Sequence, residues 1–230
     1  MVEEPERELD GGPAAELAMA RAWLWDWLAG IFSYPFSLED FRSRVTAKVP
    51  AVTEAAAALA GWGYTLEGLA EAARAAAAIG GEEELADLEM EFVRLFDTPS
   101  AGNRLHPTES VQRQGHVDLV LAGELDRLYR RWGLQPAPDA GEMADHASLE
   151  SAFLSYLAVE EARLRAAGQS AAAVEQAQAG LLSDHLLHWM PGWWRAVAET
   201  ARHPLLAAAA RIGPGLLAGD ARLFGLRQPV

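Results

Sequence analysis

The sequence contains no cysteine and only one lysine, Lys48. The absence of cysteine excludes disulfide bonds, thiolate metal ligands and cysteine nucleophiles, and it fits a cytoplasmic protein. No run of about 18 uncharged apolar residues occurs, so we expect no stable insertion into a membrane. Gly-x-Ser-x-Gly, His-Glu-x-x-His and phosphate-binding glycine loops are also missing. The sequence therefore shows no catalytic motif, and we do not expect an enzyme.

What the sequence does contain is alanine and acidic charge. Half of its 230 residues are hydrophobic, and the runs 55–58 and 75–78 consist of alanine, the best helix former. The formal net charge of −14 repels phosphate backbones, so we expect no nucleic-acid partner and an attraction to basic protein segments. The acidic N-terminus is the reverse of the basic start of a signal peptide.

Helix-breaking residues divide the chain into the elements of an all-α fold. Residues 1–13 are predicted to be a disordered acidic tail, and residues 14–230 one compact domain of about nine helices. The expected helices cover roughly 14–33, 37–48, 51–60, 65–79, 82–96, 109–132 and 146–167, then a segment from 170 that Pro191, Pro204 and Gly213–Gly215 interrupt. Between them, 97–107 and 133–142 are the longest inner loops, and long loops often carry function.

One polar cluster precedes a strongly apolar helix that contains Phe153 and Leu157. The cluster is Glu142-Met-Ala-Asp145-His146. Such a group can cap a helix, bind a metal or hold a polar ligand. Asp145 stands where an N-cap belongs, because an aspartate there accepts hydrogen bonds from free backbone N–H groups. A capping loop can still present Glu142 and His146 to a ligand.

A metal site is one alternative for this region. His185 and His188 are three residues apart, so they share one face of a helix. A helical di-iron site needs paired Glu-x-x-His motifs, and no glutamate stands three residues before either histidine. A helical metalloprotein that uses His146, His185 and His188 stays an alternative hypothesis, as does a structural helical scaffold. Stoichiometric metal in the purified protein would favour the metalloprotein.

Three blocks of sequence carry a resemblance. The first joins Glu91-Phe-Val-Arg-Leu-Phe96 to Pro107-Thr-Glu-Ser-Val111. The second is Glu142-Met-Ala-Asp145-His146, and the third runs from Asp184 to Trp194. Taken in order, they resemble the TorD/DmsD/NarJ family of cytoplasmic molybdoenzyme maturation chaperones. The second block is similar to the family's Glu-Pro-x-Asp-His signature, with methionine in the place of proline.

The resemblance implies a TorD-like helical bundle without catalytic activity or a cofactor of its own. It also implies a partner, the apo catalytic subunit of a molybdenum oxidoreductase. The chaperone would bind the twin-arginine leader or N-terminal segment of that subunit and hold it back from export until its cofactor is inserted. We expect a monomer or a helix-swapped dimer that exchanges helices at 133–142.

The chemistry of such a leader indicates which residues bind it. Arginine pairs with carboxylates, which Glu142 and Asp145 supply. The apolar run behind the arginines needs an aromatic groove, to which Tyr34, Phe92 and Phe96 contribute. With the resemblance added, the predicted peptide-binding residues are Glu142, Asp145, His146, Tyr34, Phe92, Phe96, Pro107, Glu109 and Ser110.

Overall fold

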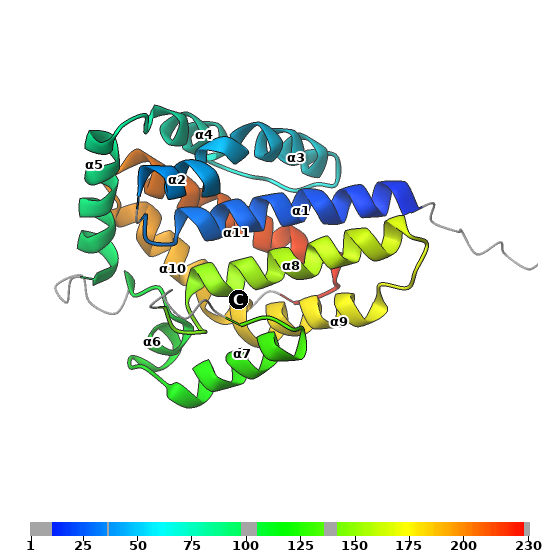
Figure 1. The fold of residues 1–230 in the computed structure, drawn as a ribbon. Coiled ribbons are helices and arrows are strands. Elements are labelled where there is room, and N and C mark those ends of the chain that lie inside the picture. The colour runs from blue at the N-terminus through cyan, green and yellow to red at the C-terminus, as the bar shows by residue number, and fades with distance from the viewer. Residues whose placement is uncertain (1–10, 36, 98–104, 136–141, 228–230) are drawn as a thin grey trace, which may run out of the picture.

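The computed structural model describes residues 11–35, 37–97, 105–135 and 142–227, which form a bundle of α-helices (Figure 1). Within these ranges nine α-helices have ten or more residues and two are shorter, which confirms the predicted all-α fold of about nine helices. The helices are α1 (Gly11–Ile31), α2 (Leu38–Arg44), α3 (Val49–Gly61), α4 (Leu69–Ala78), α5 (Glu82–Phe92), α6 (Glu109–Gln114), α7 (Leu119–Arg131), α8 (Ala147–Ala166), α9 (Ala172–Leu181), α10 (Leu187–Thr200) and α11 (Pro204–Leu223). Of the helices described, none is both long and apolar enough for a membrane crossing.

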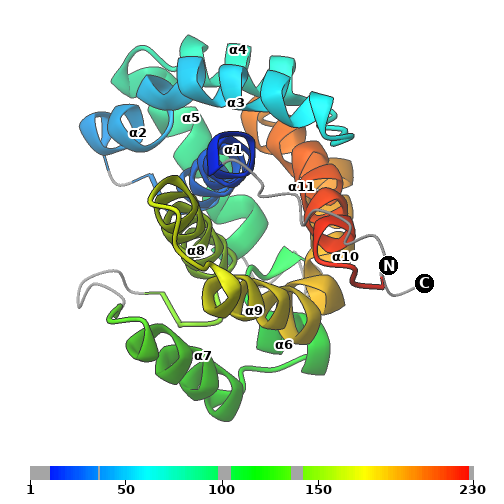
Figure 2. The same cartoon turned by 90° about the vertical axis from the view of Figure 1, so that its right-hand side faces the viewer.

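The central element is α1, around which α3, α8 and α11 are packed (Figure 2). Leu24, Trp25, Trp27 and Leu28 are all fully buried, although successive residues of a helix point about 100° apart. A helix that is apolar on most of its faces lies in the core, because those faces are unstable in water. The position of α1 therefore follows from its composition.

The C-terminal helices continue through residues that are predicted to break them. α10 contains Pro191 and α11 contains Pro214, so the predicted interruptions at Pro191 and at Gly213–Gly215 are wrong. Gly213 instead permits close packing, since a Cβ atom there would lie 2.3 Å from the indole ring of Trp194. Tertiary contacts between α10 and α11 thus outweigh the local preferences of proline and glycine.

Two other boundaries differ from the prediction. The expected helix 109–132 is divided into α6 and α7, because Gly115 is left-handed (φ 81°) and ends α6. Asp118 then caps α7 by accepting a hydrogen bond from the Val120 amide at 2.8 Å. At the N-terminus α1 begins at Gly11, so the end of the predicted tail is helical, while 1–10 lie outside the described residues.

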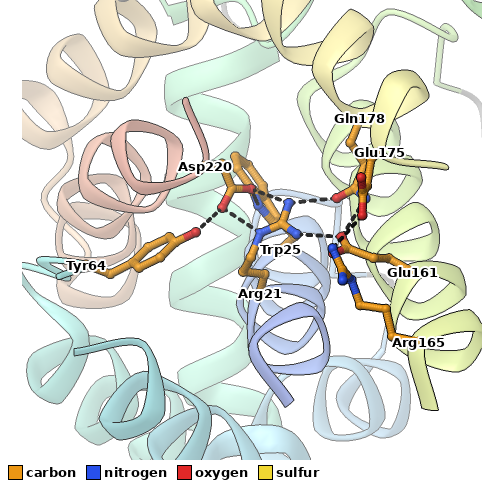
Figure 3. A network of polar contacts seen from close by, with 8 residues as sticks. All are labelled: Arg21, Trp25, Tyr64, Glu161, Arg165, Glu175, Gln178 and Asp220. Atoms are coloured by element: carbon orange, nitrogen blue, oxygen red, sulfur yellow. Dashed lines mark hydrogen bonds and ion pairs between the residues drawn. The ribbon is translucent and has the colours of Figure 1, made fainter. Parts of the chain in front are cut away.

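A buried polar network joins α1 to α8, α9 and α11 (Figure 3). Arg21 of α1 has no exposed surface, and its guanidinium donates to Asp220 at 2.8 Å and to Glu161 at 3.0 Å. Trp25 and Tyr64 also donate to Asp220, and the side-chain oxygen of Gln178 accepts from Arg21. Burial alone would lower the pKa of Arg21, but the charge and hydrogen bonds of Asp220, together with Tyr64 and Glu161, raise it, so the guanidinium stays charged.

Candidate functional site

The polar cluster before α8 lies against the start of α6. Thr108 and His146 form an isolated antiparallel β-bridge. Beside it, the Glu109 amide donates a hydrogen bond to the carbonyl oxygen of Asp145 at 2.9 Å. These backbone contacts hold the N-terminal ends of α6 and α8 next to each other, although the two helices are far apart in the sequence.

Asp145 and His146 cap different helices. The Oδ2 atom of Asp145 accepts a hydrogen bond from the Ser110 amide at 3.0 Å, which places this carboxylate at the N-terminus of α6. The N-cap of α8 is His146, whose Nδ1 accepts from the Ser148 amide at 3.2 Å. The prediction that Asp145 caps the helix that follows it is therefore wrong. The β-bridge directs its side chain toward α6 instead.

Residues of the third block of sequence contact the segment that leads into α6. Nδ1 of His185 lies 2.7 Å from Oε2 of Glu109, the first residue of α6. The indole N–H of Trp193 donates to the carbonyl oxygen of Leu105 at 3.0 Å, two residues before the first block resumes at Pro107. The three blocks on which the resemblance depends thus meet in one region of the fold.

A pocket of about 340 Å³ opens where the blocks meet. Six of the nine predicted binding residues line it, namely Tyr34, Phe92, Phe96, Pro107, Glu142 and His146. The remaining lining residues are Asp97, His106, Thr108, Val117 and Met143. The structure therefore brings together residues from the α1–α2 connection, the end of α5 and the segments before α6 and α8.

Aromatic rings form one wall of this pocket. Tyr34 contacts Phe92 edge to face, with ring centroids 5.6 Å apart, and Phe92 contacts Phe96 in the same way at 4.7 Å. Behind them Phe96 rests on Trp193 at 5.9 Å. Because Val93–Asp97 is a π-helical turn that continues α5, both phenylalanines are held on a rigid element. A rigid aromatic surface binds apolar groups at little entropic cost.

The charged residues of the first block fix this wall in place. Glu91 is nearly buried and accepts a hydrogen bond from Arg94 at 2.6 Å and another from the backbone amide of Arg202. Arg94 also donates to the carbonyl oxygen of Thr200 at 3.0 Å. These bonds tie the end of α5 to the connection between α10 and α11.

Two carboxylates face the pocket at its rim. Glu142 accepts a hydrogen bond from the hydroxyl of Ser148 at 2.7 Å, and 16% of its side chain is exposed. Burial raises the pKa of Glu142 above its ordinary value, although the Ser148 bond opposes this. A cation bound there would restore the charged form, because an opposite charge nearby favours ionisation. The second carboxylate, Asp97, is exposed at the end of the π-helical turn.

The two histidines of the pocket are neutral at pH 7. Burial lowers the pKa of His146 to about 4 and also lowers the pKa of His106. No arginine or lysine occurs among the described lining residues. Two carboxylates, two uncharged imidazoles and an aromatic wall suit a ligand that combines positive charge with apolar surface.

Three of the nine predicted residues lie behind the pocket rather than in it. Glu109, Ser110 and Asp145 are fully buried and are not part of the lining. Their contacts join α6 to α8 and to His185. In this conformation they cannot touch a ligand in the pocket, and they support the residues that can.

Five lining residues are absent from the predicted set, and three of them lie outside the three blocks of sequence. Asp97 directly follows the first block and His106 directly precedes Pro107, so nearness to the block was the available signal. Val117 lies between α6 and α7 and is 46% exposed. No periodicity marks it, because it belongs to the turn that the sequence does not predict.

The alternative of a metal centre finds no support in the geometry. His146 bonds to Ser148, and His185 bonds to Glu109. His188 is exposed on α10. Among the described residues, no three histidine, aspartate or glutamate side chains are grouped as metal ligands would be.

Comparison with known proteins places the chain in a family. Residues 55–195, more than half of the chain, match the family described as Nitrate reductase delta subunit. Over 200 residues, 87% of this chain and 90% of the relative, it is 24% identical to the chaperone protein TorD of Vibrio cholerae. Over 107 residues, 46% of this chain and 47% of the relative, it is 30% identical to the perchlorate reductase assembly chaperone protein of Dechloromonas aromatica.

The fold has a solved counterpart. A candidate redox enzyme maturation protein from Archaeoglobus fulgidus superposes with a TM-score of 0.56 at 21% identity, over 84% of this chain and 91% of that chain. This likeness shows the fold alone, whereas the match to the family over residues 55–195 contains all three blocks of sequence. The chain therefore belongs to the nitrate reductase delta subunit family, as its resemblance to the TorD/DmsD/NarJ proteins indicates.

Proposed function

We propose that this protein is a cytoplasmic chaperone for a molybdopterin-containing oxidoreductase subunit. It binds the N-terminal segment of the apo catalytic subunit, most specifically its twin-arginine leader, and assists cofactor insertion and assembly before export. The chaperone names of the matched relatives support this class of function. A protein with this task binds a chain without changing it chemically, so we propose neither catalysis nor a cofactor of its own.

The observation that carries the proposal is the chemistry of the pocket. A twin-arginine leader has two adjacent guanidinium groups followed by an apolar run. The carboxylates of Asp97 and Glu142 suit the guanidinium groups, since arginine binds carboxylates through paired hydrogen bonds. The ring wall of Tyr34, Phe92 and Phe96 suits the apolar residues beside them.

The charge of the whole chain supports the same ligand. A net charge of −14 attracts a basic segment over distances longer than the pocket itself and speeds its encounter with the protein. We therefore expect the association rate to fall as salt is added, because salt screens exposed charges over about 10 Å at 0.1 M ionic strength.

Calorimetry with a defined peptide tests the proposal. The probe is a synthetic peptide with two adjacent arginines followed by a run of leucine and alanine. We expect Asp97→Asn and Glu142→Gln each to weaken its binding about tenfold, since a charge-assisted hydrogen bond is lost. Glu83→Gln is the matched control, because Glu83 is exposed at the other end of α5.

If both pocket variants bind the peptide as the wild type does, the pocket is not the leader site. A complementary test identifies the partner. The native protein, purified from its own cytoplasm, should retain a subunit whose mass matches a molybdopterin oxidoreductase with its leader still attached. Recovery of only the mature, processed subunit would contradict binding through the leader.

A further inference from the structure

Two smaller pockets continue the aromatic pocket along one side of α8. The first, of about 280 Å³, shares Glu142 with it and is lined mainly by α1 and by the start of α8. The second, of about 240 Å³, shares Leu149 and Ala152 with the first and is closed by the end of α7. Because neighbouring pockets share lining residues, the three lie in a row beside α8, and we call this row the α8 furrow.

The far end of the α8 furrow is apolar. Its lining consists of Tyr129, Leu134, Gln135, Leu149, Ala152, Phe153 and Tyr156, with no charged residue among them. The hydroxyl of Tyr129 is already bonded to the carbonyl oxygen of Ala144 at 2.7 Å, so its ring is what the pocket presents. Tyr129 and Phe153 pack with centroids 4.7 Å apart and form the floor.

The middle of the furrow, of about 280 Å³, carries no unpaired cation. Its cations are already paired, Lys48 with Asp26 and Arg44 with Asp40, so it offers no strong free charge. Small residues of α1, Ala29 and Gly30, line it opposite α8. Such a section lets an extended chain pass without selecting a side chain.

The two ends of the furrow therefore differ in charge, because one has carboxylates beside its aromatic wall and the other has no charged residue. The acidic end holds Asp97 and Glu142, and the apolar end holds Phe153 and Tyr156. From Ser148 to Tyr156, α8 advances about 12 Å, which an extended peptide covers with about four residues. A segment in which arginines come first and apolar residues follow matches this order in one direction only.

We propose that the client segment lies along α8, with its arginines at Asp97 and Glu142 and its apolar run in the pocket between α7 and α8. This inference rests on the proposed function and adds to it a second subsite and a direction. The stripe Leu149, Ala152, Phe153 and Tyr156, spaced as one face of a helix, then serves partly as a binding surface.

Ala152 is the residue on which to test this. It is exposed and belongs to both of the smaller pockets, so Ala152→Gln places a polar side chain across the furrow with little effect on the helix. Ala166→Gln is the matched control, since Ala166 is also exposed on α8 but outside all three linings. Two peptides are compared by calorimetry, the arginine–leucine peptide and one whose apolar run is replaced by serine.

We expect Ala152→Gln to weaken the apolar peptide about tenfold and to leave the serine peptide unchanged, with Ala166→Gln like the wild type for both. If Ala152→Gln binds the apolar peptide normally while Glu142→Gln weakens it, the inference fails and the proposed function stands. If neither variant matters, or the wild type binds no peptide, both fail. A change of oligomeric state in Ala152→Gln without a change in peptide affinity would assign the furrow to a second copy and overturn the inference.

Discussion

The buried network around Arg21 gives the sharpest test of how the bundle is held together. Asp220 accepts hydrogen bonds from Arg21 Nε at 2.8 Å and Nη2 at 3.1 Å, from the Trp25 indole at 2.8 Å and from the Tyr64 hydroxyl at 2.8 Å. Asparagine in place of Asp220 keeps the size of the side chain and one acceptor oxygen. Its NH2 group, however, would face N–H or O–H donors, and the negative charge is lost. Two bonds to a charged group vanish, each contributing about 1.5–3 kcal/mol.

The expected loss of unfolding free energy for Asp220→Asn is therefore about 3–6 kcal/mol, which covers the range of about 3–5 kcal/mol found when one partner of a buried ion pair is removed. Urea titration followed by circular dichroism measures it, and the midpoint should fall by about 1–2 M. Glu160→Gln is the control, since Glu160 pairs with the exposed Arg163 and should leave the midpoint unchanged. A loss below about 1 kcal/mol for Asp220→Asn would show that the network contributes little.

Three further predictions concern pH and packing. Burial lowers the pKa of His146 to about 4, so its contribution to stability is complete above the ordinary pKa of 6.5 and falls by about 3 kcal/mol as the pH drops toward 4. The variant His146→Asn keeps an acceptor for the helix cap and should flatten this part of a plot of urea midpoint against pH. Burial and the nearby Glu109 raise the pKa of Glu150 well above 4.5, so stability is lost as pH rises through that raised pKa; Glu150→Gln should stabilise the protein increasingly above pH 4.5, and equal midpoints at pH 7 would contradict this. Gly213→Ala should destabilise by about 1–3 kcal/mol through its clash with the neighbouring indole, whereas Gly192→Ala, whose Cβ meets nothing, should stabilise the exposed part of α10 by up to about 1 kcal/mol in the same titration.

Helix existence is predictable here because each helix carries its own local signals. Alanine runs, a capping serine at Ser37 and glycine stops at Gly133 and Gly168 all act within a few residues, and the structure uses each of them. Pro191 and Pro214 mislead because their effect depends on what surrounds the helix. A proline inside a buried helix is tolerated when packing on the other faces exceeds its local cost.

The Arg21 network shows the limit of sequence reasoning about burial. From the sequence alone, an arginine in α1 is predicted to lie on the surface, and no neighbouring residue indicates that it is buried. Its partners Glu161, Gln178 and Asp220 come from three other helices and become neighbours only when the bundle closes. Pairings of this kind are invisible to local patterns, because they depend on the relative positions of whole helices.

The candidate site was predictable in position but not in the role of each residue. The blocks of the resemblance led to the pocket, yet Glu109 and Asp145 hold its walls together, whereas Asp97 reaches its rim. Sequence blocks identify which segments meet. They do not say which side chains of a segment point outward, because that depends on the turn of the chain at one or two residues, such as the β-bridge at His146.

The residues of the blocks and the residues proposed to bind the client are constrained by different contacts. Most polar residues of the blocks form hydrogen bonds that join α5, α6, α8 and α10, as Glu91, Glu109 and Asp145 show. Ala152, which is proposed to contact a client beyond the arginines, lies outside the blocks and makes no side-chain hydrogen bond, whereas the Tyr156 hydroxyl there makes one, to the carbonyl oxygen of Trp132 at 3.4 Å. A scaffold built in this way can keep its pocket for basic residues while the apolar end of the α8 furrow is adjusted to one client, which is how specificity can change without loss of the fold.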